Sequence, residues 1–344
     1  MSLAERVADR TADVAEPRRR RGGAWPAVAG YAATALVLVV LNFALPRALP
    51  GKPIEALADP RSTSYIGDDA RRATVEAHYG LDRPLAEQFG TYLADLARGD
   101  LGTSIRYNAP VAELLAERLP WTLLLLGTSL ALATAVGLLG GIESGWRRGR
   151  AADAASVSLV VAIQNVPVFF VASTAAYVFA VKLGWFPLSG ARTPFSESWG
   201  PVRQVVDVLH HLALPALVMA AEFVTLQFLV MRASVVTELG AGYLLLGRAK
   251  GLREVVLKYR YAGRNALVPA ASVIALQAGF AVTAAIFVEV VFAYPGLGRL
   301  MFEAVGARDY PTIQGVFLLL GAVVLAANGL ADLVSRRLDP RTVE

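Results

Sequence analysis

The chain has 344 residues, of which 55% are hydrophobic and only 18% are charged, and its mean hydropathy is +0.49. A soluble domain carries about 25% charged residues, and here the apolar residues form long blocks, so the composition indicates an integral membrane protein. The chain has no cysteine, which excludes disulfides, thiolate metal ligands and cysteine nucleophiles. Its net charge of +5 fits basic loops on one side of a membrane, and no aromatic and basic motif indicates binding to nucleic acid.

The amino-terminal third combines one apolar segment with two polar ones. Residues 1–23 are polar and end in four arginines and two glycines, which predicts a disordered cytoplasmic tail. Residues 24–45 are predicted to form the first transmembrane helix, because the stretch is longer than the roughly 7–15 apolar residues of a secretory signal and lacks a convincing cleavage site. Residues 46–118 are polar and are expected to form an extracytoplasmic subdomain, with short amphipathic helices at 69–78 and 84–98.

Five more apolar stretches are long enough to cross the hydrocarbon core, which takes about 20 helical residues. They are residues 121–142, 154–181, 212–235, 266–294 and 312–333. Prolines 167, 215 and 269 lie inside these spans or near their ends, where neighbouring helices can satisfy the backbone groups that proline frees. We therefore predict an all-α polytopic membrane protein of about six helices, with a five-helix core over residues 119–335.

The distribution of arginine and lysine predicts the orientation. Basic residues precede the first span, follow the second, fill the connection 237–265 between the fourth and fifth, and recur in the last segment, 336–344. With six spans all four groups lie on one side, which the positive-inside rule assigns to the cytoplasm. Both termini are therefore expected inside and residues 46–118 outside, whereas five or seven spans would break the pattern.

Short sequence words, in a fixed order, extend over most of the chain. They are Tyr79–Pro84 (YGLDRP), Arg98–Ser104 (RGDLGTS), Leu183–Gly190 (LGWFPLSG), Arg248–Leu252 (RAKGL), Arg264–Pro269 (RNALVP), Val288-Glu289, Tyr294–Arg299 (YPGLGR), Arg308–Pro311 (RDYP) and Leu338–Arg341 (LDPR). In this order the words resemble the inner-membrane permease subunits of oligopeptide and dipeptide ABC importers. One departure is Pro50-Gly51-Lys52-Pro53, where the family usually has an acidic residue in place of Lys52.

The resemblance implies the type I permease fold of ABC importers and a multi-pass protein of the bacterial cell membrane. It implies that the chain forms half of a substrate pathway. Its expected partners are a second homologous permease subunit, two ATPase subunits that bind ATP and Mg, an extracytoplasmic substrate-binding protein and the lipid bilayer. The chain has no phosphate-binding loop of the type GxxxxGK[ST], so we expect neither an enzyme nor a cofactor of its own.

Other functions remain open at this point. The cargo of a permease of this family could be a peptide, glutathione, a nickel chelate or a sugar. A self-contained secondary transporter or channel is disfavoured because no internal repeat is found. A membrane enzyme is disfavoured because no serine elbow or paired acid and base supplies a catalytic set.

The loop 237–265 mixes basic and apolar residues, as a helix lying along the membrane surface does. The resemblance implies that this loop docks into a cleft of an ATPase subunit and couples ATP hydrolysis to transport. The residues expected to carry this contact are Tyr243, Arg248, Ala249, Lys250, Gly251 and Leu252. The alternative is a basic loop resting on anionic lipid, which would explain the cations but not the Ala-Lys-Gly-Leu turn.

Polar residues inside the predicted spans are candidates for the substrate path, because a charge at the bilayer centre costs about 2.5–3.5 kcal/mol and should face protein or water. The candidates are Glu222, Gln227, Gln277 and Glu289. Glu222 lies near mid-depth and could attract a cationic group such as a peptide amino terminus, or could be a protonated or paired packing carboxyl. Glu289 lies nearer a helix end, where a structural role competes with a place near an outer gate. No metal site is expected from His78, His210 and His211, because adjacent histidines point to different sides of a helix and no third ligand is spaced nearby.

Overall fold

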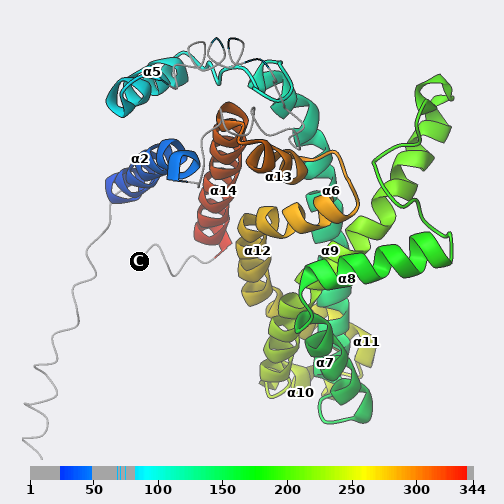
Figure 1. Ribbon diagram of the computed structural model, residues 1–344. Helices are drawn as coiled ribbons and strands as arrows, with labels where there is room; N and C mark the ends of the chain where they lie inside the picture. The colour runs from blue at the N-terminus through cyan, green and yellow to red at the C-terminus, as the bar shows by residue number, and fades with distance from the viewer. Residues whose placement is uncertain (1–23, 49–67, 69, 71–73, 75–81, 339–344) are drawn as a thin grey trace, which may run out of the picture. The chain divides into compact units, whose positions relative to one another are not determined.

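The computed structural model describes residues 24–48, 68, 70, 74 and 82–338, and it divides the chain into two compact units, residues 1–41 and 42–344. The described elements are helices, and the only extended pairing among these residues is an isolated bridge between Thr103 and Pro110. The first unit contributes the larger part of helix α2 (Ala24–Ala48), which agrees with the predicted first span. The second unit contains every other described element (Figure 1).

The second unit holds five long helical regions and several short ones. Its helices are α5 (Leu85–Ala97), α6 (Val111–Trp146), α7 (Ala151–Gln164), α8 (Val168–Ala175), α9 (Pro201–Glu238), α10 (Gly242–Ala249), α11 (Glu254–Val256), α12 (Arg264–Val291), α13 (Leu297–Ala307) and α14 (Tyr310–Leu338). The π-helical segments η1 (Ala176–Lys182) and η3 (Leu257–Gly263) continue α8 and precede α12, and a short 3₁₀ turn η2 (Ser196–Ser198) lies before α9. Helix α5 confirms the amphipathic helix expected at 84–98, whereas the one expected at 69–78 lies largely outside the described residues.

All six predicted spans fall on helices. Within the described residues, three helices are long and apolar enough to cross a membrane by themselves, namely residues 29–48 of α2, α6 and α9. Helices α12 and α14, of 28 and 29 residues, cover the fifth and sixth predicted spans, and the apolar part of α14 runs over Tyr310–Ala326. The 36 residues of α6 extend over roughly 54 Å, which is longer than the hydrocarbon core is thick. The helix begins at Val111, inside the segment predicted to be the outer subdomain.

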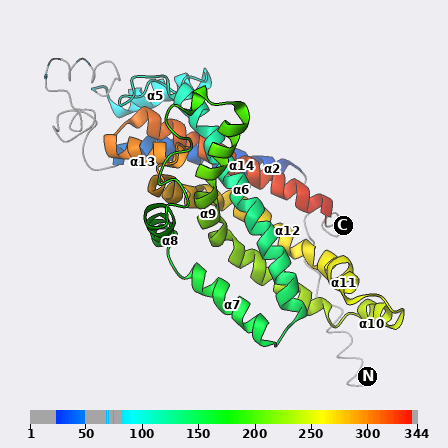
Figure 2. The same cartoon turned by 90° about the vertical axis from the view of Figure 1, so that its right-hand side faces the viewer.

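The span predicted over residues 154–181 is helical on both sides of a bend and is not one continuous helix. The chain breaks between Gln164 and Val168, and the two halves meet at 96°, so α7 with α8 and η1 forms either a broken span or a re-entrant segment (Figure 2). Pro167 causes the break locally, because it lacks an N–H group and disfavours the helical conformation of Val166. Pro215 and Pro269, in contrast, lie inside the continuous helices α9 and α12.

Helices α6 and α9 form the central contact of the second unit (Figure 2). Glycines at 137, 141 and 145 of α6 recur every four residues and face α9. A Cβ atom at Gly141 would lie 2.7 Å from the Cβ of Met231, which is closer than real side chains approach. Small residues of this kind allow close packing of membrane helices, where lipid gives little hydrophobic driving force for association.

A buried ion pair joins three helices at one end of this contact. The Arg232 guanidinium of α9 donates two hydrogen bonds, of 2.6 and 2.8 Å, to the two carboxylate oxygens of Asp153 in α7. Ser144 of α6 and the backbone N–H of Gly149 also donate to Asp153. The carboxylate is therefore fully satisfied although only 4% of the residue is exposed, and it fixes the start of α7 against α6 and α9.

Candidate functional site

The loop 237–265 contains the helix and turn that the sequence predicts. Helix α10 ends at Ala249, and Gly251 adopts a left-handed conformation with φ of +73°. The N–H of Leu252 donates to the carbonyl of Gly247, and the N–H of Gly251 donates to the carbonyl of Arg248. This pair of bonds is the Schellman motif, which ends helices at a glycine. The Ala-Lys-Gly-Leu turn is thus a helix C-cap, and a Cβ at Gly251 would meet no other atom within 4 Å.

One face of α10 packs on the rest of the loop. Leu244 is fully buried beside Leu257 of η3. Gly247 lies on the same face, where a Cβ would come 2.5 Å from a methyl carbon of Leu257. The loop is therefore a folded unit with its own small core, to which Trp146 of α6 also contributes.

The opposite face of α10 is apolar and uncovered. Leu245 is 70% exposed and Leu246 is 55% exposed, and Val255 just beyond the turn is 58% exposed. Arg248 and Lys250 are exposed beside them. This face combines an apolar ridge with cations, which is the surface expected of an element that docks on another protein or on a membrane.

Hydrogen bonds to two glutamates fasten the loop to the long helices. Glu143 of α6 accepts hydrogen bonds from Lys258 at 2.5 Å and from the Tyr259 hydroxyl at 2.7 Å. The hydroxyl of Tyr243 donates to Glu238 at the end of α9. The bond to Glu143, together with burial, raises the pKa of Tyr259. Through these bonds α10 is joined to the end of α9, and η3 is joined to α6.

Two of the four candidate path residues bond to each other between helices. The Gln227 amide of α9 donates to the Gln277 side-chain oxygen of α12 at 2.8 Å, and Gln277 donates to the carbonyl of Phe223 at 3.0 Å. Both glutamines are buried, and Oε1 of Gln227 has no hydrogen-bond partner. Their observed contacts pack α9 on α12, and their place in a substrate path stays a prediction.

Glu222, the third candidate, is half-buried on α9. Within the described part of the chain it takes part in no recorded hydrogen bond or ion pair. Of the four candidates it therefore differs most from a packing residue, because the described residues give its carboxyl no hydrogen-bond or ion-pair partner.

Glu289, the fourth candidate, is fully buried and holds the start of α13. Its carboxylate accepts hydrogen bonds from Thr122 at 2.7 Å and from the backbone N–H groups of Gly298 and Arg299 at 2.7 and 3.1 Å. A Cβ at Gly296 would lie 2.1 Å from the same carboxylate. The words Val288-Glu289 and Tyr294–Arg299 thus meet in one helix-capping arrangement, which favours the structural alternative for Glu289.

Two more of the sequence words, Arg98–Ser104 and Arg308–Pro311, contact each other at the junction of α13 and α14. Asp309 is fully buried and accepts hydrogen bonds from the Ser104 hydroxyl, the Ile105 N–H and the Thr312 hydroxyl. Ser104 lies more than 200 positions earlier in the chain. No pattern in the sequence pairs these two residues; only the shared family words indicated that both matter.

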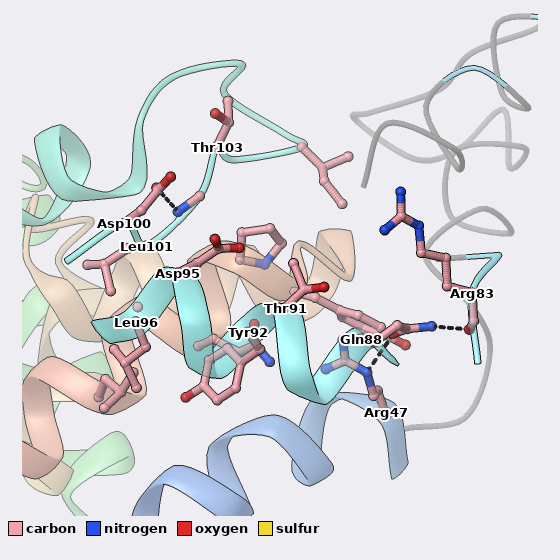
Figure 3. A pocket seen from close by; sticks show the side chains of 17 residues that line it. Arg47, Arg83, Gln88, Thr91, Tyr92, Asp95, Leu96, Asp100, Leu101 and Thr103 are labelled. Carbon is pink, nitrogen blue, oxygen red and sulfur yellow. Dashed lines mark hydrogen bonds between the residues drawn. The ribbon is translucent and has the colours of Figure 1, made fainter. Parts of the chain in front are cut away.

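Sequence reasoning did not foresee a pocket of about 370 Å³ in the predicted outer region (Figure 3). Its walls come from the end of α2, from α5, from the loop 100–105 and from the start of α14. Arg47 donates two hydrogen bonds to Gln88, and the carboxylate of Asp100 accepts one from the N–H of Gly102 (Figure 3). Several polar groups of this wall are thus paired with other groups of the same chain, and the pocket assigns no ligand.

The histidines that the structure describes bond to backbone carbonyls. His210 lies 2.8 Å from the carbonyl of Trp185, and His211 lies 2.9 Å from that of Asp207. Over residues 24–48 and 82–338, no three potential ligands gather as a metal would require. His78 lies outside the described residues, as do residues 50–53.

The fold and these contacts define a polytopic helical membrane protein with a folded loop between its fourth and fifth spans. Residues 133–344 match the family described as binding-protein-dependent transport system inner membrane component. The chain belongs to this family and is an inner-membrane component of a transport system.

Curated relatives match nearly the whole chain. A protein of Brucella ovis, provisionally named a peptide permease, is 38% identical over 89% of this chain and 94% of its own length. The dipeptide transport system permease protein DppB of Alkalihalophilus pseudofirmus is 30% identical over 88% and 94%. The glutathione transport system permease protein GsiC of Escherichia coli is 33% identical over 90% and 95%.

Proposed function

We propose that this chain is a permease subunit forming half of the translocation pathway of an ATP-driven peptide importer. It works with a second homologous permease subunit, two separate ATPase subunits and an extracytoplasmic substrate-binding protein. The observation that carries the proposal is the uncovered apolar and basic face of α10, on a loop fastened to α6 through Glu143. Such a face gives an ATPase subunit a surface to bind, and the bonds to Glu143 provide a mechanical connection to the membrane helices.

A peptide cargo is supported by the relatives, since the three compared above are named for peptides, dipeptides or glutathione, which is itself a tripeptide. None of these names favours a nickel chelate or a sugar.

The coupling role is tested with Gly251→Trp in the assembled complex in liposomes. Tryptophan at φ of +73° strains the backbone by about 1–3 kcal/mol and should displace α10 from its partner. We expect peptide uptake to be lost while the chain still inserts, and ATP hydrolysis to become independent of the binding protein. A matched control is Gly99→Trp, because Gly99 also has a positive φ, of +77°, ends a helix (α5) and has open space around it, but lies outside the loop.

Normal coupled uptake by Gly251→Trp would remove the support for coupling through α10. Equal loss in both tryptophan variants would point to general backbone strain instead. Robust ATPase activity of the isolated chain would contradict the proposal at a more basic level.

Glu222 is proposed to attract the amino terminus of the peptide, because it has no charge partner in the described part of the chain. Glu222→Gln keeps the shape of the side chain and removes the charge. We expect the KM for uptake of peptides with a free amino terminus to rise about three- to tenfold, as for the loss of one contact of about 1 kcal/mol. Uptake of peptides with an acetylated amino terminus should not change. An equal effect on both peptides would favour the packing role.

A further inference from the structure

A basic recess opens where α6 ends, beside loop 237–265. Its volume is about 600 Å³, and its walls come from the ends of α6 and α9, the start of α7 and the 237–265 loop. The lining residues are Trp146, Arg147, Arg150, Leu239, Arg248, Glu254 and Lys258.

The recess carries more positive than negative charge. Arg248 pairs with Glu254 at 3.2 Å, and both Arg147 and Lys258 pair with Glu143, at 3.4 and 2.5 Å. Two carboxylates thus face four cations, of which Arg150 takes part in no ion pair recorded for the described residues. An anion placed in the recess would balance this surplus.

The position of the recess favours an anion carried by the membrane. Trp146 is the last residue of the spanning helix α6, and tryptophan is enriched at the level of the lipid headgroups. Leu239 follows the last residue of α9, so both helices leave the bilayer here. Basic pockets between membrane helices at the cytoplasmic surface are suited to anionic headgroups. The arginine distribution predicts that this end is cytoplasmic.

We infer that the recess binds the phosphate of an anionic phospholipid, with Arg147, Arg150, Arg248 and Lys258 supplying its positive charge. The phosphate accepts hydrogen bonds from the guanidinium groups, while Trp146 and Leu239 lie against the adjoining glycerol and acyl carbons. This inference does not depend on peptide transport or on coupling through α10. It adds a lipid site at the base of the loop.

The test uses the full chain in mild detergent, with native mass spectrometry measuring the binding of added phosphatidylglycerol and phosphatidylcholine. The double variant Arg147→Gln/Arg150→Gln removes two exposed cations of the recess. Its control is Arg148→Gln/Arg253→Gln, which removes the same charge from exposed positions outside the recess. Arg150→Ala alone serves as a milder variant that leaves every recorded ion pair intact.

The wild type should bind phosphatidylglycerol more tightly than phosphatidylcholine. The recess double variant should bind phosphatidylglycerol about tenfold to thirtyfold more weakly, since each basic residue near an anionic surface contributes about fivefold. The control pair should bind as the wild type does, and Arg150→Ala should fall between them. Equal binding by the recess variant and its control overturns the inference.

Two further measurements identify the molecule that supplies the anion. Glycerol 3-phosphate carries the same phosphate without acyl chains, so equal binding of it would keep the anion site and overturn a lipid as its source. If lipid binding is unchanged but the recess variant no longer retains the ATPase subunits, the cations contact acidic residues of that protein, and the lipid inference is wrong. Either result leaves the Gly251→Trp experiment unaffected, so a failure here is distinguishable from a failure of the proposed function.

Discussion

The junctions around α13 and the loop 237–265 both carry words of the family, but they use them differently. Around α13, Glu289 and Asp309 are fully buried and accept hydrogen bonds from distant segments of the same chain. In the loop, Leu245, Leu246 and Lys250 face outward and find no cover within the described chain. A family word whose residues are satisfied internally indicates a structural role, whereas the word Arg248–Leu252, which follows an uncovered apolar face, favours contact with a partner.

The largest effect is expected from Glu289→Ala, which removes the buried hydrogen-bond acceptor at the start of α13. The substitution leaves the Thr122 hydroxyl and the N–H groups of Gly298 and Arg299 buried without an acceptor. Each such group costs about 1–3 kcal/mol, so we expect the free energy of unfolding to fall by about 3–5 kcal/mol, measured as a large drop in the Tm of the chain in detergent. Glu289→Gln, which keeps one acceptor oxygen, should cost less. A variant that is stable but inactive in uptake would instead place Glu289 in the substrate path.

Replacing both Leu245 and Leu246 by Asp tests the exposed side. The folded chain loses little, because both side chains are largely exposed. An interface centred on them would lose roughly 2 kcal/mol or more, a drop of about thirtyfold in affinity for the ATPase subunits. Co-purification of these subunits measures the loss, and Leu188→Asp provides a control at another exposed leucine outside the loop. Retained ATPase binding by the double variant would contradict docking of the ATPase subunits on this face.

A smaller effect is expected from pH at Glu303 of α13. Burial raises the pKa of Glu303, but the hydrogen bonds from Tyr107 and Arg299 outweigh burial and hold the pKa below its ordinary value. A lowered folded pKa stabilises the protein above the ordinary glutamate value of about 4.3, and this stability is lost as the pH falls through the lower folded pKa. At pH 7 the free energy of unfolding of the wild type should therefore be about 1 kcal/mol larger than that of Glu303→Gln. The wild type should accordingly have the higher Tm at this pH. The two Tm values should converge below pH 4, and a constant difference would contradict the assignment.

Local features of the fold could be predicted, but its long-range contacts could not. The spans follow from continuous apolar stretches, and Gly251 marks a helix end because glycine adopts positive φ without strain. The bend at Pro167 was missed, since Pro215 and Pro269 show that proline alone does not decide whether a membrane helix breaks.

The same limit applies to the buried polar pairs. Asp153 and Arg232 lie 79 positions apart, and nothing in the spacing of either residue indicates the other. The same holds for the candidate site. The loop 237–265 could be predicted from its local composition, whereas its contacts with Glu143 of α6 could be seen only in the structure.

The smallest effect is expected from Arg248→Ala and Lys250→Ala, and it sharpens the comparison by separating charge from shape. The ion pair of Arg248 with Glu254 is largely exposed, with 45% and 60% of the side chains accessible, and such pairs contribute about 0.2–1 kcal/mol. If α10 docks through its leucines and its Gly251 turn, losing both charges should weaken ATPase binding only a few fold, and less than Gly251→Trp does. If the loop only rests on anionic lipid, the order reverses, because cations provide most of that attraction and the turn provides none. Parallel measurement of uptake and ATP hydrolysis in liposomes gives the order directly, and greater damage from the two alanines would exclude docking through the turn.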